Sequence, residues 1–234
     1  MAIPTLIISP PWFRGFDCVF EYFGVLVFLL IALFAYKATK MTNDQKTKWL
    51  FVSFLLIAAS YFIKAFRNIN LYFPFERQLL IGSLEVKYTS LAIINLVPII
   101  DFTSRVLFLL GLVGVYFLIT QSEEKKHMAL MVYFITIVTY VSSIVPYVFH
   151  LTSAILLAEI SYFYLKKTER KRLNQKLVLT AFLSLMMSQM LFLTFHPGLY
   201  VSAGILELFG FVLLLFSYVL VHFSVRELKI KKEK

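Results

Sequence analysis

The amino-acid sequence predicts an all-α fold: a polytopic membrane protein with seven transmembrane helices, its N-terminus outside the cell and its C-terminus in the cytoplasm. Composition is the first reason, because 60% of the 234 residues are hydrophobic and only 15% are charged, whereas soluble domains are nearer half apolar and a quarter charged. The chain also contains apolar runs long enough to cross a bilayer. Its basic residues, finally, gather in every second connection between those runs.

Each transmembrane span is justified by the length of an apolar run. A helix needs about 20 mostly apolar residues to cross the hydrocarbon core. Five runs meet this requirement directly, at 18–36, 49–66, 102–120, 177–195 and 200–223.

The stretch from Met128 to Leu165 predicts two further spans. It holds 38 residues and one acid, Glu159, and a single straight helix of that length would reach about 57 Å. Because this exceeds the bilayer and Pro146 lies near the middle, we predict two helices, 128–145 and 148–165. A tight outer turn around Ser143–His150 joins them.

The basic residues predict the orientation. Seventeen of the 23 lie in 37–48, 121–127, 166–176 and the tail 224–234. The positive-inside rule assigns these segments to the cytoplasm, which predicts a multi-pass plasma-membrane protein in contact with anionic lipid headgroups. The formal net charge of +10 is therefore a topology signal, and we expect no nucleic-acid partner.

One long connection, 67–101, is predicted to lie outside the membrane. Pro74 and Gly82 interrupt it, while Leu79–Ile81 and Leu91–Ile94 are apolar. We expect a cap or short helix on the outer face of the bundle.

The sequence also contains a faint internal repeat. Gln45-Lys46 precedes the second span as Gln175-Lys176 precedes the sixth, and Leu110–Val113 in the third matches Phe209–Val212 in the seventh. This pattern indicates a parallel repeat of three plus one plus three helices, with the fourth as linker.

Polar residues within the spans are the candidate ligand-binding residues, because ionisable groups in a membrane are costly. Glu207 lies about 10 Å below the outer end of its helix at 1.5 Å per residue. Most of the others fall in the same outer half, above an apolar inner half, and Glu159 is near the midplane. The predicted set is Tyr61, Asp101, Arg105, Tyr140, Glu159, Gln189 and Glu207.

A purely structural interpretation stands beside this one. Asp101 and Arg105 are spaced i,i+4 on one helix face and would neutralise each other. Glu207 and Glu159 would then serve only helix packing, through hydrogen bonds to Gln189 or tyrosines.

No cofactor is expected. Cys18 is the only cysteine, and the seventh span lacks the lysine that a retinal protein needs. Haem is not expected either. His150 and His196 fall at outer helix ends and would be the metal ligands if there were any, but no ligand spacing supports such a site. Catalytic motifs are missing as well, so we expect no enzyme.

Two segments resemble uncharacterised archaeal seven-helix membrane proteins. They are YKATKMTNDQKTKWLFVSFLLIAASYFIKAF, residues 36–66, and HPGLYVSAGILELFGFVLLL, residues 196–215. The resemblance implies a membrane protein and no activity.

The concentration of polar residues in the outer half favours a sensor or binding protein with an outward-facing pocket. It would signal to a separate cytoplasmic protein partner docked on the basic segments. A small-solute transporter built on the repeat and a structural subunit of a membrane complex are the alternatives.

Overall fold

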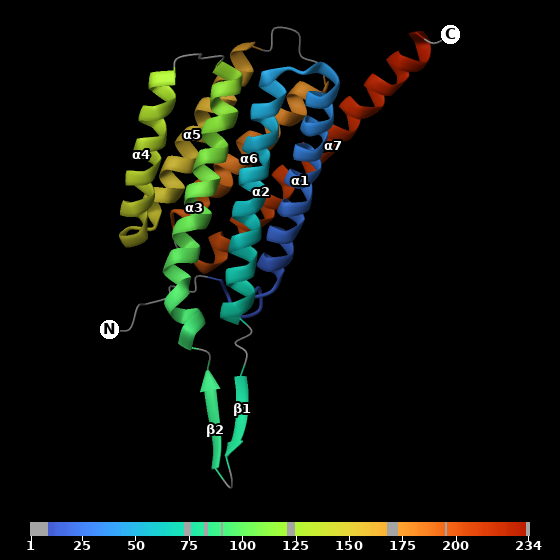
Figure 1. The fold of residues 1–234 in the computed structure, drawn as a ribbon. Helices are drawn as coiled ribbons and strands as arrows, with labels where there is room; N and C mark the ends of the chain where they lie inside the picture. The colour runs from blue at the N-terminus through green and yellow to red at the C-terminus, as the bar shows by residue number, and fades with distance from the viewer. Residues whose placement is uncertain are drawn as a thin grey trace.

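The computed structural model describes residues 9–72, 76–81, 84–89, 91–120, 125–167, 173–194 and 196–232, and Figure 1 shows its helices and hairpin. In chain order these residues form α1 (Phe16–Thr42), α2 (Gln45–Tyr72), β1 (Glu76–Ile81), β2 (Leu84–Thr89), α3 (Leu91–Thr120), α4 (Lys125–Ile144), α5 (Tyr147–Lys167), α6 (Leu173–Phe192) and α7 (Pro197–Lys232).

The predicted helical membrane protein is confirmed. Among the described residues, all helices except α4 are long and apolar enough to cross a membrane, which makes six candidate spans. The apolar part of α4, Leu130–Ile144, is shorter. A seventh crossing by α4 therefore stays a prediction.

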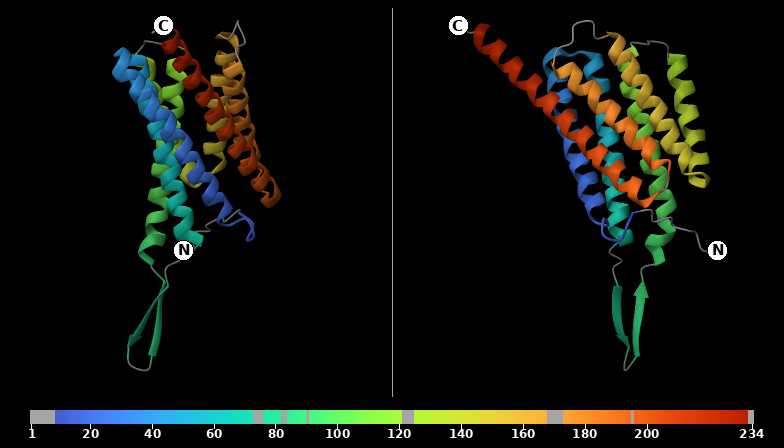
Figure 2. Two further views of the ribbon diagram at one scale, coloured as in Figure 1. Left: turned by 90° about the vertical axis from the view of Figure 1, so that its right-hand side faces the viewer. Right: turned by 180° about the vertical axis from the view of Figure 1, so that it is seen from behind.

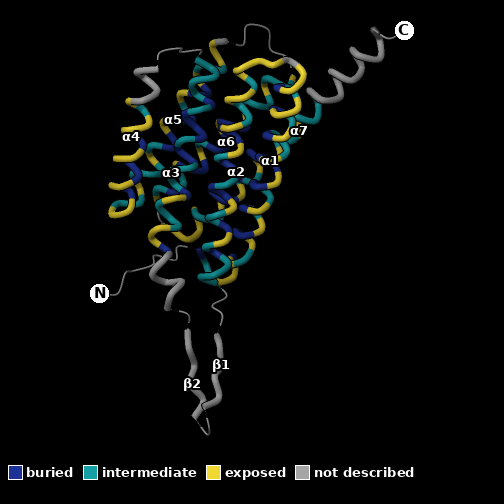
Figure 3. Tube along the Cα trace, viewed as in Figure 1, coloured by how far each residue is buried: buried dark blue, intermediate teal, exposed yellow. Residues whose placement is uncertain are grey.

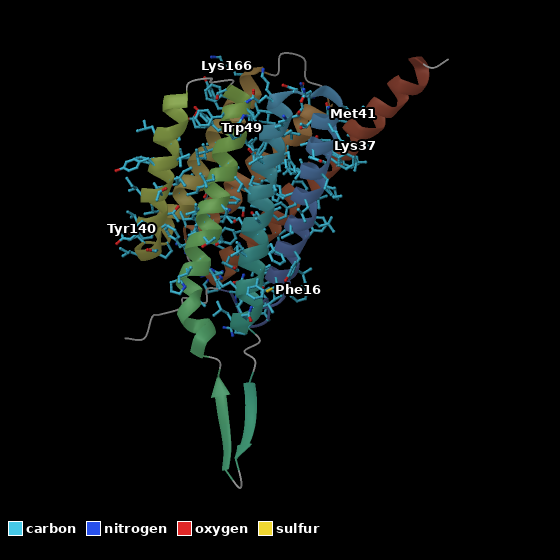
Figure 4. The ribbon with its side chains drawn as sticks, in the orientation of Figure 1. Phe16, Lys37, Met41, Trp49, Tyr140 and Lys166 are labelled. Atoms are coloured by element: carbon cyan, nitrogen blue, oxygen red, sulfur yellow. The ribbon has the colours of Figure 1, made fainter. Side chains whose placement is uncertain are left out.

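The helices run up and down, so their connections alternate between two ends (Figures 1 and 2). The C-terminal ends of α1, α3, α5 and α7 lie at one end, where Lys37, Lys40, Lys46 and Lys166 are exposed. We call this the basic end, and Figure 4 shows Lys37 and Lys166 toward it. The opposite end, from which β1 and β2 project, is the hairpin end.

Six helices close a ring. Packing follows the order α1, α2, α3, α5, α6 and α7, and α7 returns to α1. The fourth helix, α4, packs outside this ring against α3 and α5. A side chain therefore reaches the interior of the bundle only from one face of each ring helix.

Local sequence signals fix the turns between helices. At the end of α1, Asn43 takes the left-handed conformation (φ 49°) and its N–H bonds to the Thr39 carbonyl at 2.8 Å, as C-terminal caps do. Asp44 then accepts a bond from the Lys46 N–H at 3.1 Å and caps α2. Pro146 separates α4 from α5, because it cannot donate to the preceding helix. The predicted two-helix division at this proline is confirmed.

The ring interior toward the basic end is apolar. Phe28, Leu157, Ile160 and Phe211 are buried there in one cluster, and Figure 3 shows buried residues along the inner helix faces. Close approach of α2 and α3 requires Gly111, because a Cβ at this position would lie only 2.8 Å from the Ser53 carbonyl oxygen.

The structure differs from the short helix expected in the connection at 67–101. The connection at 67–101 holds a β-hairpin, in which Glu76 pairs with Thr89 and Ile81 with Leu84, instead of a short helix. Helices α2 and α3 also extend past the predicted limits of 66 and 102. An ion pair between Arg67 and Asp101 joins these two extensions.

Helix α7 continues through residue 232, within the predicted basic tail at 224–234 (Figure 1). This segment contains no proline or glycine that would end a helix.

Candidate functional site

A cavity of about 320 Å³ lies within the ring at the hairpin end. Helices α2, α3, α5, α6 and α7 all contribute to its wall. The titratable side chains in that wall are Tyr61, Lys64, Arg67, Tyr72, Asp101, Arg105, His150, Tyr200 and Glu207. A second cavity of about 10 Å³ adjoins it and shares Lys64 and Glu207, a volume on the order of one water molecule.

Helical periodicity brings these residues to one place. On α2, Tyr61, Lys64 and Asn68 are spaced i, i+3 and i+7, which places them on one face. On α3, Asp101 and Arg105 are spaced i,i+4. Each face points into the ring because its neighbours toward the basic end are apolar and pack in the core.

Tyr61 marks the boundary between the cavity and the apolar core. Its ring packs against Phe28, Phe108 and Phe211, with centroids 5.2–5.7 Å away. Its hydroxyl donates to Oε1 of Glu207 at 2.6 Å, and both side chains are buried. The aromatic cluster thus forms the floor of the cavity, and the Tyr61–Glu207 bond lies directly on that floor.

Glu21 of α1 is the centre of a buried polar group beside the cavity. It forms an ion pair with Nζ of Lys64 at 3.1 Å and accepts bonds from Nδ2 of Asn68 at 2.8 and 3.0 Å. The Lys64 ammonium also lies 5.7 Å from the ring centroids of both Tyr61 and Phe192, within the range of cation–π attraction. These contacts tie α1 to α2.

Asp101 pairs across helices and not along its own. Its carboxylate accepts from Nη1 of Arg67, and Arg67 also donates to Oδ1 of Asn68 at 3.0 and 2.6 Å. Arg105 instead donates from Nη1 to the carbonyl and hydroxyl oxygens of Ser142 on α4. The structural interpretation paired Asp101 with Arg105, whereas in the structure the ion pair of Asp101 is with Arg67.

His150 and Gln189 join α5 to α6. Nδ1 of His150 lies 2.8 Å from Oε1 of Gln189. An amide oxygen can only accept, so Nδ1 carries the proton and donates. The ring of His150 packs against Phe149 and Phe192, and the remaining nitrogen, Nε2, has no hydrogen-bond partner among the described residues.

Five of the seven predicted site residues line the cavity together. They are Tyr61, Asp101, Arg105, Gln189 and Glu207. Whether they bind a ligand stays a prediction.

The structure does not bring the other two to the cavity. Tyr140 on α4 is 66% exposed and points away from the bundle in Figure 4. Glu159 on α5 is also exposed. The prediction chose both by depth along the helix, and depth does not determine which face points inward.

Sequence reasoning missed four members of the polar network. They are Glu21, Lys64, Arg67 and Asn68, of which the last two fall in the connection that was predicted to lie outside the membrane. The available signal was the spacing of Lys64 and Asn68 from Tyr61, which places all three on one helix face.

His150 and His196 make separate contacts in the structure. His196 is exposed and accepts a bond from the Gly198 N–H at 3.3 Å, at the start of α7. His150 contacts Gln189 instead. Among the described residues, no three His, Cys, Asp or Glu side chains lie close enough to hold a metal ion.

Fold and site together define a class: a polytopic α-helical membrane protein with a ring of six helices and, at one end of that ring, a cavity whose wall holds charged and polar side chains. No protein-family model, curated protein or solved structure matches the chain.

Proposed function

We propose that the protein is an integral-membrane sensor or binding protein whose ligand occupies the cavity at the hairpin end. The observation that carries this proposal is a polar cavity above an apolar floor. Arg105, Gln189 and Glu207 line the cavity, whereas Phe28 and Phe211 fill the ring beneath it. A channel or proton pump needs polar groups through the full thickness of the membrane. A binding site that opens at one end of the bundle needs no polar groups between the site and the other end.

The hairpin end is proposed to face the cell exterior at the plasma membrane. Support comes from the lysines exposed at the opposite end, including Lys37, Lys46 and Lys166, because basic connections stay in the cytoplasm. Under this orientation the ligand arrives from outside. The basic end meets anionic lipid headgroups and offers a surface to a separate cytoplasmic protein.

Signalling would use the interhelical bonds around the cavity. Glu21–Lys64 joins α1 to α2, Arg67–Asp101 joins α2 to α3, and Tyr61–Glu207 joins α2 to α7. A ligand that takes a partner from one of these pairs favours a different packing of the ring, in proportion to its differential affinity for the two packings. The change in packing would extend along the same helices to the basic end, where the cytoplasmic protein would detect it.

Native mass spectrometry of gently solubilised protein tests the proposal. We expect a discrete small-molecule adduct on the wild-type chain and lower occupancy in Glu207→Gln and Arg105→Ala. Glu159→Gln is the matched control for the carboxylate, because Glu159 lies outside the cavity. If both cavity variants fold and keep full occupancy, the ligand lies elsewhere and the proposed site is wrong.

Transport of a small solute is the second candidate. It is favoured by similar packing in α1–α3 and α5–α7, which the predicted repeat relates to each other. Gly111 of α3 approaches Ser53 of α2, and Gly210 of α7 approaches Ala181 of α6, where a Cβ would lie 3.2 Å from the Ala181 carbonyl oxygen. Repeats of this kind are common in transporters.

Solute uptake into proteoliposomes separates the two candidates. Transport requires the floor around Phe211 to open, so uptake would favour transport over sensing. Under the transport hypothesis as predicted from sequence, Glu159→Gln abolishes that uptake. A stable stoichiometric complex with another membrane protein, without an adduct or uptake, would favour the structural-subunit alternative.

A further inference from the structure

Arg105 differs from the other cations of the cavity because it lacks a carboxylate partner. Lys64 pairs with Glu21 and Arg67 with Asp101. These are the only ion pairs among the described residues. The carboxylate of Asp101 lies one turn from Arg105 on the same helix. It attracts Arg105 through space, but it forms its ion pair with Arg67.

The contacts of Arg105 leave one edge of its guanidinium open. Both of its hydrogen bonds start from Nη1 and end on Ser142, the one to Oγ at 3.3 Å. Nε and Nη2 have no partner in the part of the chain that the structure describes. These two groups form the side-on fork with which arginine binds a carboxylate or phosphate through two parallel bonds.

The surroundings of Arg105 suit an apolar ligand body. Its guanidinium carbon lies 5.6 Å from the ring centroid of Phe149, and Phe149 contacts Phe108 on the cavity wall. Phe102 and Phe192 also line the cavity. A volume of about 320 Å³ is at the lower end of the range for ligand sites.

We propose that the ligand is a small organic anion: a carboxylate or phosphate group on an apolar body, bound side-on by Nε and Nη2 of Arg105. This inference rests on the proposed function and specifies its ligand class. Arg105 is half-buried, and a cation within a membrane protein is costly unless paired. An anion in the cavity supplies the missing partner. The aromatic wall formed by Phe108 and Phe149 then covers the body of the ligand.

Two sources supply this chemistry: a soluble organic acid, or the acidic group of a lipid that enters from the bilayer. Titration calorimetry on the whole protein in nanodiscs distinguishes them. Phenylacetate is the anionic probe and phenylacetamide its neutral isostere. Nanodiscs of phosphatidylcholine lack anionic headgroups, whereas discs containing phosphatidylglycerol present competing lipid phosphate.

We expect phenylacetate to bind the wild-type protein in phosphatidylcholine discs, and phenylacetamide to bind at least about tenfold more weakly, since bonds to charged groups are the stronger ones. Arg105→Gln should remove this preference, and Arg105→Lys should keep part of it, because lysine retains the charge without the fork. Arg14→Gln is the control, since Arg14 is exposed and outside the cavity.

Loss of phenylacetate binding specifically in phosphatidylglycerol discs would identify lipid phosphate as the natural anion. Equal binding of acid and amide by the wild-type chain overturns the anion inference and leaves the proposed function standing. A preference for the acid that survives in a folded Arg105→Gln variant overturns it too. Absence of both probe binding and any adduct in native mass spectrometry overturns the inference together with the proposed function.

Discussion

The two ends of the helix ring are held together in different ways. At the hairpin end, buried polar side chains bond to other helices, as Tyr61 does to Glu207 and Asn68 to Glu21. Toward the basic end, buried hydroxyls mostly bond within their own helix, as Ser53 does to the Trp49 carbonyl and Ser161 to the Leu157 carbonyl. Contact between helices there is largely apolar.

Because of this difference, we expect the apolar half to determine the stability of the fold and the hairpin end to determine ligand binding. Packing in the apolar half requires close contact but no particular polar partner, because lipid and core are equally apolar. Bonds at the hairpin end depend on the relative positions of the helices, and a ligand can compete for them. Substitutions in the floor should therefore change stability, whereas substitutions in the cavity wall should mainly change binding.

Phe211→Ala should have the largest effect on stability. Its ring is fully buried between Phe28 and Tyr61, so the change leaves a void and costs about 3 kcal/mol. A thermal melt in detergent measures the loss. Phe209→Ala, at a position that is 49% exposed, is the matched control and should change little. Equal melting temperatures for the two variants would show that the buried ring of Phe211 does not stabilise the fold more than the exposed ring of Phe209.

Gly111→Ala should have the second-largest effect on stability. The new Cβ would lie 2.8 Å from the backbone oxygen of Ser53, which cannot rotate away, and overpacking of this kind costs about 2 kcal/mol. Gly210→Ala should cost less, because the nearest atoms to its Cβ belong to the Leu185 side chain, at 3.0 Å. The same thermal melt compares the two variants. A larger fall in melting temperature for Gly210→Ala than for Gly111→Ala would contradict this order.

Tyr61→Phe should cost about 1 kcal/mol, since it removes one buried hydrogen bond and leaves Glu207 without its donor. The aromatic packing of the floor remains. The comparison with Tyr140→Phe isolates the bond, because Tyr140 is exposed outside the ring. If both variants melt at the wild-type temperature, the Tyr61–Glu207 bond does not stabilise the fold.

Glu159→Leu should have the smallest effect, within about 0.5 kcal/mol of wild type as for other exposed positions. The side chain faces outward from α5, so leucine fits a lipid-facing surface. A clear fall in melting temperature in nanodiscs would show that Glu159 is covered by a partner and not by lipid.

Much of this protein was predictable from its apolar and basic patterns. Helices at all seven predicted spans, the turn at Pro146 and the position of most polar residues in one half of the bundle follow from length and periodicity. The hairpin at Glu76–Thr89 did not. Nor did the pairing of Arg67 with Asp101, because these two residues lie 34 positions apart in the chain.

The sequence by itself determined that the chain needs lipid as solvent, since no soluble core could bury so many apolar residues. It also determined which residues lie at the depth of the cavity. The tertiary structure decided which of them face it: α4 packs outside the ring, so Tyr140 is exposed, and the rotation of α5 turns Glu159 outward. It also decided the partners of each charge. Depth is a property of one helix, whereas facing and pairing arise only when neighbouring helices pack.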